Sequence, residues 1–254
     1  MPVTLERTPL VRLDYVAPLR WLRRVVFASA ASLVVMDVVA SYLAGTNRLR
    51  GVTRFFDADF KTNCPSSYKI LALLTSTIFL WLITEASRIT LDRFSRHWRV
   101  LAGVFAFLTL DEMTALHQSF SAMLHKEIGG SGYLKYSWQV VYLAALGLLA
   151  VYFIPFLHHL GPRMRVRLLA AAILFGGGSG GVEFIKAHLE STGSDETLSF
   201  KLVAAVSDSA EMIGLAILLL LLLDFLTARV AAVSVRLPDG ENEAGQLAQH
   251  TLDP

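Results

Sequence analysis

Long apolar runs alternate with short polar stretches along the chain, and this pattern predicts membrane-spanning helices. A span needs about 20 predominantly apolar residues to cross the hydrocarbon core. Six windows meet this condition: Val25–Ala44, Tyr68–Ser87, Trp98–Gln118 or slightly beyond, Trp138–Leu157, Val166–Ile185 and Ser199–Leu226. We therefore expect an all-α, polytopic membrane helix bundle with about six transmembrane helices.

The composition agrees with a membrane protein. Hydrophobic residues make up 54% of the 254-residue chain and charged residues only 17%, which is too apolar for an ordinary soluble domain. The net charge is only +2, and the basic residues are not clustered on one face. We therefore expect membrane lipids and no nucleic acid as partners. Cys64 is the single cysteine, which excludes an intrachain disulfide and a thiolate metal cluster.

The distribution of Lys and Arg predicts the orientation. The segments between successive windows alternate between the two sides of the membrane. Fourteen Lys and Arg lie on the same side as the N-terminus, and nine, including Lys69, lie on the opposite side. Because Lys and Arg are enriched in cytoplasmic loops, both termini are expected inside. The expected organisation is a cytoplasmic interfacial segment over 1–24, one transmembrane domain over 25–229 and a disordered cytoplasmic tail over 230–254.

Acidic residues within the spans are the strongest functional signal. At about 1.5 Å per residue, four different spans bring carboxylates to the outer half of the bilayer. These acids are Asp37, Asp111, Glu112, Glu183, Asp208 and Glu211, with His117 near the outer boundary. Ionisable groups inside a span are costly and suggest a functional site. With no Lys or Arg expected at that depth, the acids must hold metal cations, protons or both.

A metal centre is the first hypothesis. Its ligands would be Glu112, His117, Glu183, Asp208 and Glu211, and the oxygen-rich set favours Fe, Mn or Mg over Zn. Asp111 would be the general base of a metal-dependent hydrolase or oxidoreductase that acts on a lipid or another apolar substrate. The five-residue spacing of Glu112 and His117 is poor for chelation from one regular helix.

Two other hypotheses use the same residues. The acids could form a proton relay or the site of a proton- or cation-coupled transporter, with the glycine-rich run Gly176–Gly181 breaking the fifth helix. Alternatively, they could form a structural hydrogen-bond network in a subunit of a membrane complex. The spacing of the glycines lets another helix approach closely, so an oligomer or a protein partner could bind at Gly176–Gly181.

Three short motifs carry a resemblance. They are Leu110-Asp111-Glu112 with His117, Gly181-Val182-Glu183, and Asp208 with Glu211-Met212-Ile213-Gly214. Together they resemble motifs of an uncharacterised family of bacterial multipass membrane proteins, although Asp208 stands where that family has glutamate and Gln118 follows the histidine. The resemblance implies a shared site on the third, fifth and sixth spans and a location in the bacterial inner (plasma) membrane. It implies no particular activity.

Overall fold

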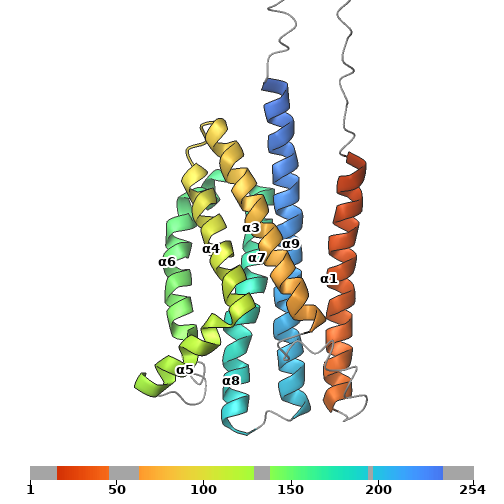
Figure 1. Ribbon diagram of the computed structural model, residues 1–254, viewed down its shortest axis with the longest axis vertical. Helices are drawn as coiled ribbons and strands as arrows, with labels where there is room; N and C mark the ends of the chain where they lie inside the picture. The colour runs from red at the N-terminus through yellow and green to blue at the C-terminus, as the bar shows by residue number, and fades with distance from the viewer. Residues whose placement is uncertain (1–15, 46–62, 129–137, 194–196, 237–254) are drawn as a thin grey trace, which may run out of the picture.

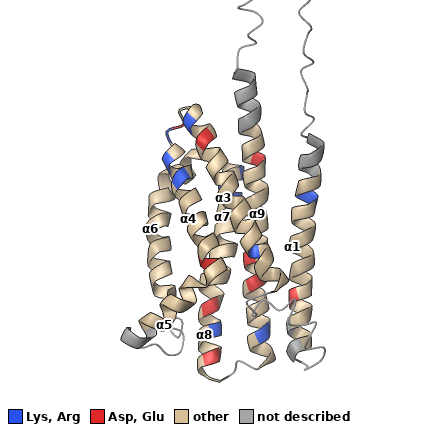
Figure 2. Ribbon diagram, in the orientation of Figure 1, with Lys and Arg blue, Asp and Glu red and all other residues tan. Residues whose placement is uncertain are grey.

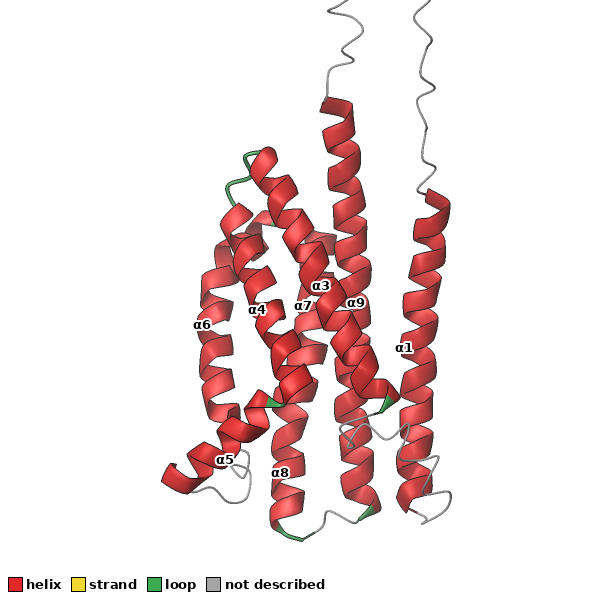
Figure 3. Ribbon diagram, in the orientation of Figure 1, coloured by secondary structure: helices red, strands yellow, loops and turns green. Residues whose placement is uncertain are grey.

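Every regular element in the described part of the chain is a helix (Figure 3). The computed structural model describes residues 16–45, 63–128, 138–193 and 197–236. Residues 1–15 and 237–254, parts of the expected interfacial segment and tail, lie outside this range. The helices are α1 (Val16–Gly45), α3 (Cys64–Ile89), α4 (Ser95–Thr114), α5 (Leu116–Ile128), α6 (Trp138–His159), α7 (Pro162–Gly176), the π-helix η2 (Gly177–Val182), α8 (Glu183–Ser191) and α9 (Leu198–Arg236).

Four of these helical segments are long and apolar enough to cross a membrane, which confirms a helical membrane-type fold. They are Cys64–Ile89, Trp138–His159, Pro162–Ser191 and Leu198–Ala228. The pair Ser95–Thr114 and Leu116–Leu124 adds a fifth if it is one span, although it is bent by 78°. Helix α1, which contains Val25–Ala44, is not among them, so a sixth span stays a prediction.

Helix α9 lies at the centre of the bundle and packs against α1, α3 and α7 (Figure 1). Its buried side chains, such as Leu215 and Leu222, join a core with Leu80 and Ile83 of α3 and Trp98 of α4. The first residues of α1 and the last residues of α9 lie at the same end of the bundle. Most basic residues gather at that end, whereas the acidic residues of α1, α4 and α8 and most of those of α9 lie in the other half (Figure 2).

Glycines set the spacing between α9 and the α7–η2–α8 segment. A Cβ on Gly214 would lie 2.7 Å from the backbone N of Phe175, and one on Gly178 would lie 2.7 Å from the carbonyl O of Ser207. The Ser207 hydroxyl donates to the Gly178 carbonyl O at 2.8 Å, which ties α9 to the π-helix. The glycine-rich run therefore continues the helical segment as a π-helix and does not break the fifth span.

The glycine run is also partly covered from a second side. Ideal Cβ positions on Gly176 and Gly180 would each lie 3.8 Å from a leucine of α6, Leu146 and Leu143 respectively. Gly177 and Gly181 meet nothing within 4 Å. A partner that binds through this run, which stays a prediction, would therefore have to use Gly177 and Gly181.

Gly214→Ala is expected to destabilise the protein by about 1–3 kcal/mol, because the new methyl group would overlap the backbone of α7. Gly103→Ala is the matched control, since its Cβ would meet nothing within 4 Å in the interior of α4. That change should leave stability unchanged or raise it by up to about 1 kcal/mol. Thermal unfolding of both variants in detergent measures the difference, and equal melting temperatures would contradict the packing described.

Candidate functional site

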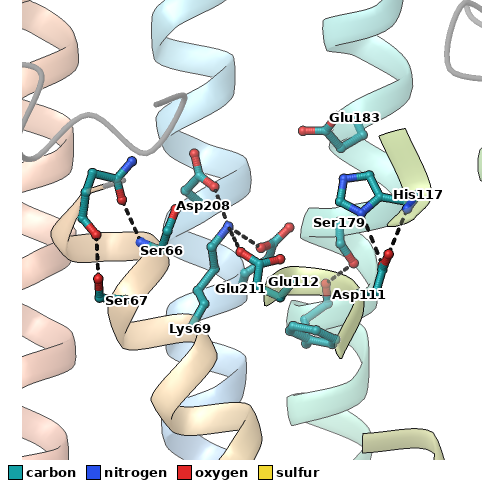
Figure 4. A network of polar contacts seen from close by, with 12 residues as sticks. Ser66, Ser67, Lys69, Asp111, Glu112, His117, Ser179, Glu183, Asp208 and Glu211 are labelled. Carbon is teal, nitrogen blue, oxygen red and sulfur yellow. Dashed lines mark hydrogen bonds and ion pairs between the residues drawn. The ribbon is translucent and has the colours of Figure 1, made fainter. Parts of the chain in front are cut away.

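A buried lysine lies among three carboxylates where α3, α4 and α9 meet (Figure 4). The Lys69 Nζ is 3.1 Å from Oδ1 of Asp208 and 3.0 Å from Oε2 of Glu211. It is 3.6 Å from Oε1 of Glu112. We call these four residues the Lys69 cluster.

The start of α3 determines where Lys69 lies. Asn63 caps this helix, and its side-chain oxygen accepts a hydrogen bond from the Ser66 backbone N at 2.7 Å. Pro65 occupies the first turn, where its missing N–H is tolerated. Helix α3 therefore begins before the apolar window at Tyr68, and Lys69 lies in its second turn, inside the bundle.

The three acids are brought to Lys69 by helix geometry. Asp208 and Glu211 are three residues apart in α9, so both carboxylates project from one face of that helix. Glu112 lies in the last turn of α4. Gly178 of η2 packs directly on Glu211, at 3.0 Å from its Cγ to an ideal Cβ, so the π-helix closes the cluster from the side opposite α3.

The cluster has more negative than positive formal charge. The side chains of Lys69, Asp208 and Glu211 are only 10–12% exposed, and that of Glu112 is 25% exposed. With every group ionised, one ammonium would face three carboxylates. A buried net charge of this kind is costly and is relieved when a proton or a second cation binds. The arrangement is therefore suited to exchanging protons or small cations.

The expectation that no Lys or Arg reaches the depth of the acids is wrong. It counted Lys69 with the outer loop because the apolar window starts at Tyr68. The signal that could have placed Lys69 is the sequence Asn63-Cys64-Pro65, a capping residue followed by proline, which marks a helix start upstream of the window.

Asp111 and His117 form a separate pair on the α4–α5 corner. Oδ1 of Asp111 accepts a hydrogen bond from the His117 backbone N at 2.7 Å, and Oδ2 lies 3.1 Å from the imidazole Nδ1. The corner is made by Ala115, whose φ of 52° and ψ of 43° are left-handed. Such a conformation costs an alanine roughly 1–2 kcal/mol, and the two contacts of Asp111 offset that cost.

Glu183 also lies outside the Lys69 cluster. Its Oε1 is 3.0 Å from Nζ of Lys186, one turn later in α8. Asp37, the acid of α1, is buried at 1% exposure.

The five residues predicted as metal ligands therefore occupy three places. Glu112, Asp208 and Glu211 surround Lys69, whereas His117 contacts Asp111 and Glu183 contacts Lys186. Within the described residues, no three His, Cys, Asp or Glu side chains are placed to hold one metal ion. The divalent metal and the role of Asp111 as a general base stay predictions.

Lys69→Met is expected to destabilise the protein by about 3–5 kcal/mol, because it leaves two buried carboxylates and the half-buried Glu112 without their cation. The double variant Lys69→Met/Glu211→Gln should recover part of that loss. Arg88→Met is the control, since the Arg88–Glu85 pair is exposed and contributes less than about 1 kcal/mol. Thermal unfolding in detergent ranks the variants. A Lys69→Met protein as stable as Arg88→Met would contradict the ion-pair geometry.

Comparison with known proteins gives a family and no function. Nothing among curated proteins or solved structures matches the chain. A family model described as a domain of unknown function, DUF8692, matches residues 25–225, which is most of the chain and contains the whole Lys69 cluster. The protein belongs to the DUF8692 family.

Proposed function

We propose that this protein moves protons or small cations in a membrane through the Lys69 cluster. The observation that carries the proposal is the pairing of one buried ammonium with three carboxylates from α4 and α9. Ionisable groups within membrane spans mark proton relays and ion pathways. The proposed setting is a six-span bundle with both termini inside, in the bacterial inner membrane.

The charge count suggests how such a site works. When a carboxylate of the cluster takes up a proton, the remaining groups approach charge balance around Lys69. When that proton leaves, the excess negative charge returns and attracts either another proton or a cation in competition with the ammonium. Opposite charges in a poorly hydrated site interact strongly, so each step changes the contacts of Lys69 with α4 and α9.

The contacts of Lys69 also distinguish between the hypotheses drawn from the sequence. A metal centre needs several ligands directed at one point, whereas here Lys69 already occupies the point between the acids. A purely structural role would be served by one carboxylate for one ammonium. The surplus of carboxylates favours ion handling over both.

Glu211→Gln is expected to lower proton or cation flux into proteoliposomes on the order of tenfold or more, because it removes a titrating group of the cluster. Glu183→Gln is the matched control, since the same change is made in a carboxylate of α8 that contacts Lys186. It should keep most of the flux. Fluorescent pH and cation indicators trapped in the vesicles measure both.

Two results would overturn the proposal. The first is wild-type flux no greater than that of protein-free liposomes. The second is equal flux for Glu211→Gln and wild type. If Glu211→Gln does not purify as a folded protein, Asp208→Asn serves in its place, since Asp208 contributes the other close carboxylate of α9.

A further inference from the structure

We propose that the Asp111–His117 pair is the port through which protons pass between the outer aqueous side and the Lys69 cluster. This inference rests on the proposed function, because a port has meaning only if the cluster exchanges protons. It assigns a role to Asp111 and His117, which lie outside the Lys69 cluster.

The pair has the geometry of a proton-exchange site. The imidazole Nδ1 of His117 is 3.1 Å from Oδ2 of Asp111, and the His117 backbone N donates to Oδ1 at 2.7 Å. This second bond fixes the carboxylate relative to the ring. The carboxylate therefore favours the tautomer in which Nδ1 carries the proton, and Nε2 is left to accept one. Histidine is the side chain whose ordinary titration range lies nearest neutral pH.

The exposure of the two side chains decreases from His117 to Asp111. The His117 side chain is 23% exposed and that of Asp111 is 9% exposed. From α6, the Trp138 ring lies 5.1 Å from the imidazole, and the Tyr142 hydroxyl interacts with Asp111. Two charged residues of the neighbouring α8, Glu183 and Lys186, form an ion pair with each other. Asp111 is therefore the acid that contacts the histidine.

The bend between α4 and α5 places the pair where α4 ends and α6 begins. Helix α5 turns away from α4 by 78° after Ala115 and runs outward past the end of α6, while α8, α9 and α1 extend further in the same direction (Figure 1). His117 is the second residue after this bend. It therefore lies where the chain turns away from α4, in the half of the bundle opposite the first residues of α1 (Figure 1).

The last turn of α4 joins the two groups of residues. Asp111 contacts His117, and the next residue, Glu112, contacts Lys69. Figure 4 shows the Asp111 and Glu112 side chains leaving this turn toward their different partners. A proton that reaches Asp111 therefore arrives in the same helical turn that supplies Glu112 to the Lys69 cluster. No other described helix contributes a carboxylate to both groups.

The transfer balances in protons and charge. A proton from the outer side binds Nε2 of His117 and gives an imidazolium. The Nδ1 proton then moves to Oδ2 of Asp111, which leaves a neutral imidazole and a carboxylic acid. Asp111 becomes a carboxylate again when its proton passes to the Glu112 carboxylate. Exchange with water, which gives a proton to Nδ1 and takes one from Nε2, restores the starting tautomer.

The test compares proton flux in proteoliposomes for the wild type and two His→Gln variants. His117→Gln should lower the flux on the order of tenfold, because a glutamine amide neither gains nor loses a proton near neutral pH. His158→Gln is the matched control, since His158 is an exposed residue in the last turn of α6, at the other end of the bundle. It should leave the flux unchanged.

Chemical rescue separates proton exchange from a structural role. His117→Ala should be as slow as His117→Gln, and millimolar imidazole added to the outer buffer should restore much of its flux, because free imidazole can carry the proton to Asp111. A defect in the helix corner would not respond to imidazole. Normal flux in His117→Gln, or no rescue of His117→Ala by imidazole, overturns the port while the effect of Glu211→Gln leaves the proposed function standing. Absence of wild-type flux overturns both.

Discussion

The ion cluster around Lys69 is the interaction on which the arrangement of the bundle depends. It joins α3, α4 and α9 through one ammonium, and it does so where water is scarce and an unpaired charge is costly. Each helix must therefore keep its register along its neighbours. Gly178 and Gly214 allow this, because their missing side chains let η2 and α7 approach α9 closely enough to cover Glu211. Packing and charge pairing thus specify the same helix positions.

Much of the fold could be predicted from the sequence, because long apolar runs have few alternatives to helices in a membrane. The helical segments over Tyr68–Ser87, Trp138–Leu157 and Ser199–Leu226 all lie within helices of the structure. The convergence of acids could also be predicted from depth alone, and Glu112, Asp208 and Glu211 do meet. Their partner could not, because a hydropathy window starts at the first apolar residue and Lys69 lies beside that boundary. A cap residue defines the start of α3 better than hydropathy does.

The residues outside the Lys69 cluster show what an estimate of depth along a straight span does not predict. His117 follows Glu112 by five residues, and a regular helix would have carried it further along the same axis. Instead, Ala115 adopts a left-handed conformation and the chain turns by 78°. Alanine gives no local sign of such a turn, since glycine or asparagine is the usual residue there. The turn is stabilised by Asp111, which is six residues from His117 in sequence, so a contact between side chains decides the backbone path.

The separation of the acids into groups also changes what each group can do. A single site with five ligands would hold one metal ion and would need all its residues at once. Two groups joined by the last turn of α4 permit a sequence of steps, because Asp111 contacts His117 and the next residue, Glu112, contacts Lys69. In the proposed function, the half-buried histidine and the buried lysine are the two ends of one path. In the proposed function, direction along that path would follow from access, since the His117 side chain is more exposed than that of Lys69.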